Sequence, residues 1–552
     1  MDYCYTSRLS SNNSSVEICN EELDEHDFTN LINELAQNDN LTALSLQFIN
    51  LTDERTRILF EVLKTNTSKL KHLDLRSNFI GAGGAKIISQ YLMMNPSLTA
   101  LNLGNNNIGE EGTVDITNSL LKNEQLNTIC LTGNNIGSSG AQAIAELFII
   151  NNTINNVDLS YNNFTNIGMD IITRSLTTNK SLIYLNLAKN ISTYGELALL
   201  CEVLKLNLSM ATLILCNNSI SDAGALSISN LLLTNCTLTS INLSDNLISD
   251  IGAIHIAECL KKNNLIELDL EINQVGDQGL KVLSKALRYN NSLDLLNLSF
   301  NNISNTGVNH LSKAMKTNQK LSQLLLMSNN ITDAKKWITN LLKHNNSLQY
   351  LDISCNSIRN KGLEYFSNAL GINESVTELN FSQNSIGDDG AKFITLALSK
   401  NIALLSLDIS ENDMSEVGMN VIIQGLKNQP SRLIELAICQ RGIKLDDDEI
   451  LNGILATNQD RSMQCVEQLI IAQIILCSSD RGILNILPPE LIHIIIFQLG
   501  APFHLLSILQ TRLVCKHATQ RFRLSRGWWE QRATQQNEMD FYRLVYRTKN
   551  CT

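Results

Sequence analysis

The side chains best suited to covalent or metal chemistry are scattered along this chain. It has 13 cysteines and 8 histidines among 552 residues, and no two cysteines have the C-x-x-C spacing of redox and zinc sites. The nucleotide-binding pattern G-x-x-x-x-G-K-[ST] and the hydrolase patterns G-x-S-x-G and H-E-x-x-H do not occur. We therefore expect no catalytic centre, no metal and no cofactor, and we expect free thiols in a reducing, cytoplasmic compartment.

Acidic side chains are the other chemical feature, and they favour binding over catalysis. The formal net charge is -11, which argues against non-specific binding of nucleic acid. From Arg481 onward, basic residues outnumber acidic ones, so the acidic surplus lies in the preceding part of the chain. This asymmetry predicts two functional parts. No apolar stretch reaches the roughly 20 residues of a membrane span.

The acidic part is built from a repeated sequence. The template L-x-x-L-x-L-x-x-N-x-I-x-x-x-G, followed by an apolar helical pattern, restarts about every 28 residues, as in solenoid proteins. The repeats start at Leu41, Leu70, Leu98, Leu126, Ile154, Leu182, Met210, Leu238, Leu265, Leu293, Leu321, Leu348, Val376, Leu404 and Leu433. The sequence therefore predicts about 15 repeats.

Each part of the template predicts one structural element. The L-x-L stretch alternates with period two and indicates a short strand. The asparagine after it, as in Asn78 and Asn246, is expected to satisfy buried backbone groups and to form a ladder between coils. The glycine, as in Gly112, permits close approach or a positive φ. Because helices are wider than strands, stacked units should curve, with a parallel sheet on the concave side and helices on the convex side.

These residues resemble the ribonuclease-inhibitor class of leucine-rich repeats, which also includes repeat arrays of NOD-like receptors and of Ran GTPase-activating proteins. The resemblance covers residues 41 to about 445 and implies an α/β leucine-rich-repeat solenoid shaped as a horseshoe. Two repeats depart from the template. One is a residue short before Gly195, and the repeat starting at Leu321 has Lys335 in place of the glycine.

Three parts of the chain follow from this pattern. Residues 1–40 are predicted to be an N-terminal tail and a helical cap, with the cap beginning at Asp27. Residues 41–480 are predicted to be the solenoid with a degenerate end repeat near Val466, and residues 481–552 a small all-α segment with a basic tail. The caps are needed because a terminal unit cannot bury its own apolar face.

The third, fifth, seventh and eighth positions of the template should point away from the core. The outward acidic residues that we predict to bind a partner are Glu267, Asp269, Glu271, Asp352, Glu378, Asp408 and Glu411. A concentration of acids of this kind predicts attraction of a basic protein surface. The alternative is that the repeat itself sets these positions and that the side chains are merely solvated.

Between the acidic zones lies a predicted apolar patch in three adjacent repeats. Its members are Leu295, Phe300, Leu325, Met327 and Tyr350. Exposed apolar clusters often mark interfaces, and aromatic residues are frequent hot spots. The alternative is shielding of these side chains by their neighbours.

The segment after the repeats resembles an F-box. Leu487-Pro488, Glu490-Leu491 and Leu513-Val514-Cys515-Lys516 match that family in order and spacing, whereas His517-Ala518 stand where a tryptophan is usual. The resemblance implies docking on the Skp adaptor of cullin-RING ubiquitin ligases. The implied adaptor contacts are Leu487, Pro488, Leu491, Ile495, Leu499 and Val514. A helical cap over the last repeat is the alternative.

Three classes of function remain open at this point. The first is a substrate-recruiting receptor of a ubiquitin ligase, with its target on the concave face. The second is a scaffold or inhibitor without a ligase link, and the third is a GTPase regulator resembling the Ran activators. The combination of eukaryote-like modules with asparagine- and isoleucine-rich composition also resembles effectors of intracellular bacteria, for which the compartment would be the host cytosol.

Overall fold

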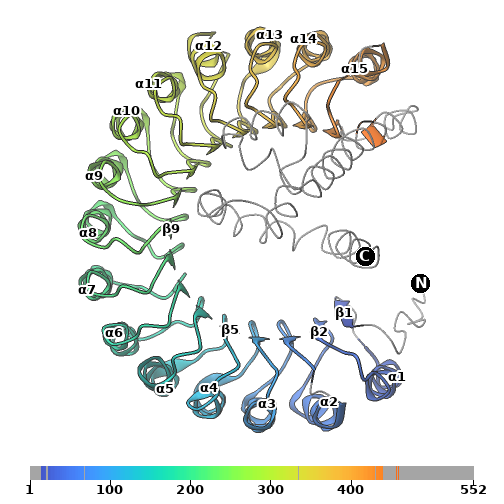
Figure 1. Ribbon diagram of the computed structural model, residues 1–552, viewed down its shortest axis with the longest axis vertical. Coiled ribbons are helices and arrows are strands. Elements are labelled where there is room, and N and C mark those ends of the chain that lie inside the picture. Colours follow the sequence, from blue (N-terminus) through green and yellow to red (C-terminus); the bar gives the residue numbers. More distant parts are fainter. Residues whose placement is uncertain are drawn as a thin grey trace, which may run out of the picture.

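The computed structural model describes residues 14–19, 23–66, 69–333, 335–428 and 431–438, together with 455, 456 and 458. Within these residues, 16 strands and 15 helices alternate without exception. The strands form one parallel sheet in chain order from β1 to β16. Figure 1 shows the result as a horseshoe with strands on the inner side and helices on the outer side. The predicted α/β horseshoe solenoid is confirmed.

The strands are short and evenly spaced. Their bounds are β1 Ser15–Cys19, β2 Ala43–Gln47, β3 His72–Asp74, β4 Ala100–Asn102, β5 Thr128–Cys130, β6 Asn156–Asp158, β7 Tyr184–Asn186, β8 Thr212–Ile214, β9 Ser240–Asn242, β10 Glu267–Asp269, β11 Leu295–Asn297, β12 Gln323–Leu325, β13 Tyr350–Asp352, β14 Glu378–Asn380, β15 Ser406–Asp408 and β16 Glu435–Ala437. In-register pairing places equivalent template positions side by side, as with Leu44, Leu73 and Leu101.

One helix follows each strand except the last one described. The helices are α1 Glu25–Ala36, α2 Asp53–Asn66, α3 Ala82–Met94, α4 Gly109–Leu120, α5 Gly137–Ile150, α6 Asn166–Ser175, α7 Tyr194–Leu204, α8 Asp222–Leu232, α9 Asp250–Leu260, α10 Asp277–Leu287, α11 Asn305–Met315, α12 Lys335–His344, α13 Arg359–Leu370, α14 Asp388–Leu398 and α15 Glu416–Asn428. The template leucines lie between the two layers and are buried, as at Leu268 and Leu270.

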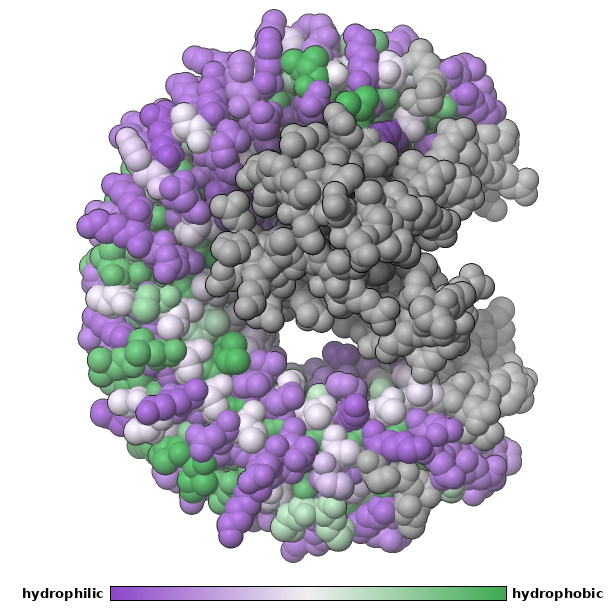
Figure 2. Space-filling model, in the orientation of Figure 1, coloured by the Kyte–Doolittle hydropathy of each residue, from purple (hydrophilic) through white to green (hydrophobic). Residues whose placement is uncertain are grey.

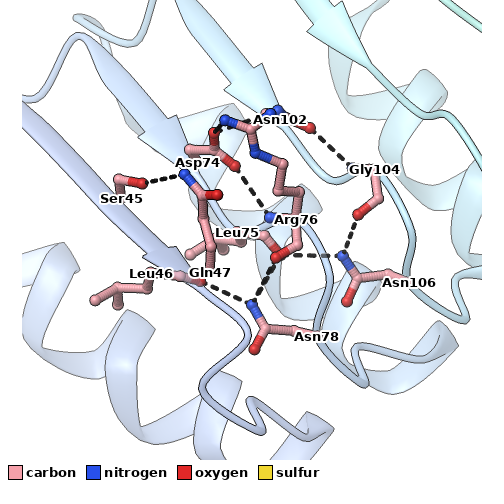
Figure 3. A network of polar contacts seen from close by, with 10 residues as sticks. All are labelled: Ser45, Leu46, Gln47, Asp74, Leu75, Arg76, Asn78, Asn102, Gly104 and Asn106. Carbon is pink, nitrogen blue, oxygen red and sulfur yellow. Dashed lines mark hydrogen bonds and ion pairs between the residues drawn. The ribbon is translucent and has the colours of Figure 1, made fainter. Parts of the chain in front are cut away.

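The template asparagine forms the predicted ladder. Asn78 donates from Nδ2 to the carbonyl oxygens of Leu46 (2.8 Å) and Leu75 (3.0 Å), in the previous coil and its own. Its Oδ1 accepts from the backbone N–H groups of Ile49 (3.1 Å) and Leu51 (3.0 Å). Figure 3 shows Asn78 and Asn106 in this arrangement. One buried amide thus satisfies backbone groups that the three-residue strands leave unpaired.

A second asparagine ladder, which the sequence analysis missed, lies where each helix leads into the next strand. Asn207 donates from Nδ2 to the carbonyl of Leu176 (3.0 Å) and accepts at Oδ1 from the N–H of Met210 (3.0 Å). The corresponding residues are Asn123, Asn151, Asn179, Asn235, Asn290, Asn318, Asn345, Asn373 and Asn401. Asn151 and Asn207 each begin an N-x-[ST] sequence, and both are buried. That motif has a structural role here, because its asparagine holds the loop.

The template glycines serve close approach. A Cβ on Gly112 would lie 2.8 Å from the Cβ of Ala85 and 2.7 Å from Cγ2 of Ile108. The sequence analysis also allowed that the template glycine has a positive φ. Positive φ values occur at the eighth template position instead. There φ is 49–57° in residues other than glycine, such as Ser77 (57°) and Phe300 (52°), and 62° in Gly133. The glycine is therefore needed for helix packing.

Acidic residues at the start of one helix cap the next helix. Oδ1 of Asp222 accepts from the N–H groups of Ser249 and Gly252, both at 2.8 Å, where α9 begins. Asp277 makes the same contacts with α11, and Asp388 with α15. The hydrogen bond from Ser415 lowers the pKa of Asp388. Charge at the helix starts thus satisfies N–H groups that lack helical partners.

The N-terminal part contains a strand that the sequence analysis did not predict. β1 pairs in parallel with all five residues of β2, and its Val16 and Ile18 are buried. The predicted helix is present as α1. Thus the predicted helical cap is part of a complete strand–helix unit, which has Val16 and Ile18 in place of the template leucines and lacks the template asparagine and glycine.

The two repeats that depart from the template keep the fold. In the shorter one, α7 begins with a capping box in which Thr193 and Glu196 exchange hydrogen bonds with each other's backbone. In the other, α12 begins at Lys335, and its buried Trp337 packs edge-to-face on Phe366 with ring centroids 5.5 Å apart. In these two repeats, the capping box of α7 and the packing of Trp337 therefore take the place of contacts that the template residues make in other repeats.

Removing one amide from either ladder should destabilise the solenoid. We expect Asn246→Ala and Asn207→Ala each to lose about 1–3 kcal/mol of unfolding free energy, because buried backbone groups lose their partner. Urea unfolding followed by circular dichroism measures the change. Asn264→Ala, in an exposed loop residue, is the control and should unfold like the unmodified chain. Equal stability of all three variants would contradict the ladders' role.

Candidate protein-binding surface

The concave sheet brings the predicted binding residues of neighbouring coils into two rows. In the third-position row, Glu267 lies beside Leu295 on the adjacent strand. In the fifth-position row, the residues run Asp269, Asn297, Leu325 and Asp352 across β10 to β13. Parallel, in-register strands about 4.8 Å apart make these side chains immediate neighbours. The acidic and apolar groups predicted from sequence are therefore adjacent.

The acidic cluster on β10 is partly withdrawn from water. Burial raises the pKa of Asp269 to about 6, although the N–H of Glu271 donates to its Oδ1 at 2.9 Å. Burial also raises the pKa of Glu267, which accepts from the hydroxyl of Ser240 at 2.9 Å. Glu271 accepts from Nδ2 of Asn297 at 3.0 Å. These three carboxylates are held in fixed positions by neighbouring polar groups.

The acids of the fifth position have a structural role that sequence did not reveal. Oδ1 of Asp408 accepts from the N–H of Ser410 two residues later (2.9 Å), and Asp269 makes the same turn with Glu271. Asparagine does this in other coils, as at Asn242 with Ser244. The sequence analysis left open that the repeat itself sets the residue type at these positions. At the fifth position this explanation applies to the carboxylate oxygen that accepts the turn hydrogen bond, and the other oxygen is not covered by it. Glu267 and Glu271, at the third and seventh positions, accept instead from Ser240 and Asn297 of neighbouring coils.

Two residues predicted to lie on the open surface are largely buried. Tyr350 is 8% exposed and Asp352 is 7% exposed. The hydroxyl of Tyr350 donates to Asp352 Oδ2 (3.3 Å), and Asp352 Oδ1 accepts from the N–H and hydroxyl of Ser354. The prediction that this pair lies in the open is therefore wrong, because their polar atoms pair within the protein.

The apolar patch is open at its strand-exit side. Phe300 is 40% exposed, and Leu295, Leu325 and Met327 are half-buried. Ile272, which the sequence analysis did not select, is 46% exposed next to the acidic cluster. It occupies the eighth template position, like Phe300, so the same rule would have found it. We call Ile272, Phe300, Leu325 and Met327 the apolar ledge.

The backbone at the ledge is unusual. Phe300 and Ile272 have φ of 52° and 49°, in the left-handed region. This region is uncommon outside glycine, asparagine and aspartate, and for a β-branched residue such as Ile272 it is a genuine outlier. The solenoid imposes the conformation, but it does not require an apolar side chain there. Exposed apolar residues at these positions thus add nothing evident to the fold.

The second acidic zone lies on the last strands. Glu378 and Glu435 occupy the third position on β14 and β16, and both pair with Ser406 of β15 between them. Glu378 and Glu411 are half-buried and Glu435 is exposed. At the opposite end of the sheet, Arg76 forms an ion pair with Asp74 at 3.0 Å (Figure 3). The excess of outward acids is thus concentrated on β10 and on β14 to β16.

Three cysteines on the described part of the chain are poor nucleophiles. Burial raises the pKa of Cys130, Cys201 and Cys259 to about 12 in each case, so these thiols stay protonated at neutral pH. Among the described residues, no group of three histidine, cysteine or acidic side chains could hold a metal ion. The predicted adaptor contacts, Leu487, Pro488, Leu491, Ile495, Leu499 and Val514, lie outside the described residues.

Comparison with known proteins agrees with the repeat pattern. A family model described as "Leucine Rich repeat" matches residues 67–89, 95–116, 122–145, 234–257, 261–284, 289–311, 344–367 and 373–394. No curated protein sequence matches the chain. Repeats of this kind support a scaffold for protein interaction. No described helix has the length and apolar character needed to cross a membrane.

Solved structures with a similar chain path have low sequence identity. The TLR13–ssRNA13 complex gives 18% identity and a TM-score of 0.44, covering 73% of this chain and 53% of that one. An internalin (inlF) from Listeria monocytogenes gives 18% identity and a TM-score of 0.33, covering 71% of this chain and 86% of that one. The mouse RP105/MD-1 complex gives 15% identity and a TM-score of 0.37, covering 74% of this chain and 76% of that one. This chain thus spans about half the length of the TLR13 chain.

The raised pKa of Asp269 predicts a pH dependence of stability. Its pKa of about 6 in the folded chain exceeds the unfolded value, so ionisation destabilises the fold as pH rises through about 6. We expect Asp269→Asn to gain about 1 kcal/mol at pH 7.5 and to gain less at pH 5. Thermal unfolding at the two pH values measures this. Asp269→Ala, which also loses the acceptor for the Glu271 N–H, should gain less, and a gain independent of pH would contradict the assignment.

Proposed function

Since the chain is a leucine-rich-repeat protein, we propose that it binds a partner protein on its concave face, at β10 to β12. The partner would present a basic and apolar surface. The observation that carries this proposal is the proximity of two unlike groups. Glu267 and Asp269 lie beside Leu295 and Asn297 of β11, and Glu271 directly precedes Ile272 of the apolar ledge, whose largest member is Phe300.

The two groups would contribute differently to binding. Half-buried carboxylates are less screened by salt than exposed ones, and they would steer and orient a basic partner. Apolar side chains that lose contact with water supply most of the affinity at typical interfaces, and the aromatic ones are often hot spots. The ledge is already held in one backbone conformation by the coil, so binding would cost little ordering of the chain.

We further propose that residues 481–552 link the solenoid to a ubiquitin ligase. This rests on the F-box-like order of Leu487-Pro488, Leu491 and Val514 in the sequence. Under this proposal the solenoid recruits a substrate, and the C-terminal segment contacts a Skp adaptor. A scaffold or inhibitor without the ligase link would retain the concave-face partner but lose the adaptor. A GTPase regulator would instead change the rate of GTP turnover by its partner.

Removing the apolar ledge should abolish binding without harming the fold. We expect Phe300→Asp combined with Met327→Asp to weaken capture of concave-face partners, identified by crosslinking and mass spectrometry, by about 100-fold or more. Phe48→Asp is the matched control, because Phe48 is 51% exposed with φ 55° at the same template position in a distant coil. Association rates should also fall with rising salt. Equal loss in the control, or no loss in either variant, would contradict the site.

The adaptor proposal has a separate test. We expect the full chain to capture a Skp adaptor in a pulldown, and Leu487→Ala combined with Pro488→Ala to abolish capture, because both side chains belong to the implied contact. The ledge variant should capture the adaptor normally. Absence of capture by the unmodified chain, or capture unaffected by the double substitution, would contradict the ligase link while leaving the concave-face proposal intact.

A further inference from the structure

The loops of the solenoid form two edges of the horseshoe. The segments that lead from each helix to the next strand form the helix-end edge, and the segments that lead from each strand to the next helix form the helix-start edge. Because all strands are parallel, each kind of loop stays on one side of the molecule. Each edge is therefore one continuous broad face of the horseshoe, distinct from the concave sheet (Figure 1).

The helix-end edge carries large apolar side chains that the core does not use. They are Met93, Met94, Ile149, Ile150, Leu206, Leu208, Leu233, Tyr289, Ile372 and Ile402. Leu206 and Leu208 are 71% and 70% exposed, and they flank the buried Asn207 of the second ladder. The space-filling view shows hydrophobic side chains gathered over α5 to α8 (Figure 2). Most members are aliphatic and spread along the ring.

The same edge carries exposed cations. They are Lys69, Lys71, Lys180, Lys261, Lys262, Arg288, Lys316, Lys320, Lys343 and Lys400. Among the described residues, only Lys320 of this set forms an ion pair, with Asp294 at 3.3 Å. The exposed acids on this edge are Asp39, Glu124 and Glu374. The edge is therefore positive in a chain whose formal net charge is -11.

Two other faces of the molecule carry many acidic side chains. The helix-start edge carries the capping acids Asp222, Asp250, Asp277 and Asp388, and the concave sheet carries the β10 acids. The helix-start edge also carries exposed cations, namely Lys335, Lys336, Arg359 and Lys361. An anionic surface would therefore meet mixed charges on that edge, repulsion from the β10 acids of the concave sheet, and the most uniform attraction from the helix-end edge. The helix dipole also favours cations at helix ends, but it gives no reason for aliphatic side chains beside them.

We propose that the helix-end edge docks on an anionic membrane surface. The aliphatic side chains at the ends of α3, α5, α7 and α8 would enter the headgroup boundary, and the cations after α9 to α12 would contact the lipid headgroups. This combination of buried apolar area and cations is the physical basis of interfacial membrane binding. The proposal is independent of the concave-face partner, which would stay accessible on another surface.

The distribution of residues favours a lipid surface over a protein. Protein interfaces concentrate their energy in a compact centre, whereas here the apolar and cationic groups extend from α3 to α14 on one broad face. A flat, extended and anionic partner is the one that reaches all of them at once. A second copy of this chain, contributing its acidic helix-start edge, is the competing occupant, and self-association would reveal it.

Vesicle flotation tests the proposal with the full chain. We expect binding to phosphatidylcholine vesicles that contain about 30% phosphatidylserine, weak binding to phosphatidylcholine alone, and loss of binding as salt rises to about 0.5 M. Lys261→Glu with Lys262→Glu, and separately Leu206→Ser with Leu208→Ser, should each lower the apparent affinity about tenfold or more. Met93→Ser with Met94→Ser is a second apolar variant in case the leucine variant unfolds.

The controls change the same chemistry elsewhere. Ile167→Ser with Ile251→Ser removes exposed apolar groups from the helix-start edge, and Lys86→Glu reverses a charge on the outer side of α3. Both should bind vesicles like the unmodified chain. Failure of the unmodified chain to bind, equal binding to neutral vesicles, or unaltered binding by the edge variants would overturn the proposal. Sedimentation showing self-association that Lys261→Glu with Lys262→Glu abolishes would assign the edge to a second copy instead.

Discussion

The hydrogen bond from a buried asparagine amide to the backbone of the neighbouring coil is the interaction on which the structure depends. Three-residue strands leave most of each coil's backbone without a sheet partner. Asn78 and its equivalents satisfy the turn after each strand, and Asn207 and its equivalents satisfy the turn before it. Because each amide also reaches the preceding coil, the two ladders set the coils' spacing. The leucine core then fills the space between them.

This constraint separates positions that the fold determines from positions that remain free. Asp269 and Asp408 accept the N–H two residues later, so part of their negative charge serves the turn. Ile272 and Phe300 have no such duty, and they occupy a left-handed conformation that their side chains do not favour. The apolar ledge therefore carries more information about function than the acids that lie beside it.

Sequence was sufficient for the repeat, the sheet, the outer helices and the first ladder, because each has a fixed residue type at a fixed spacing. It missed β1, whose unit has Val16 and Ile18 in place of the template leucines and lacks the asparagine and glycine, and it missed the second ladder, whose asparagines lie outside the template. The burial of Tyr350 and Asp352 was not predictable either, since it depends on packing between strands and on contacts such as the hydroxyl of Tyr350 with Asp352.

The distribution of charge has the same origin as the fold. At several coils an acid at the helix start serves the fold, since Asp277 supplies both an acceptor and a favourable charge to the N–H groups of α11. In other coils an asparagine supplies the acceptor, as Asn360 does for the N–H of Gly387. Parallel stacking places all of these acids on one edge and leaves the opposite edge without that requirement. Cations and aliphatic groups there are not needed for capping or for the core. A solenoid therefore obtains oppositely charged faces from a single repeated coil, and its free positions can serve more than one partner.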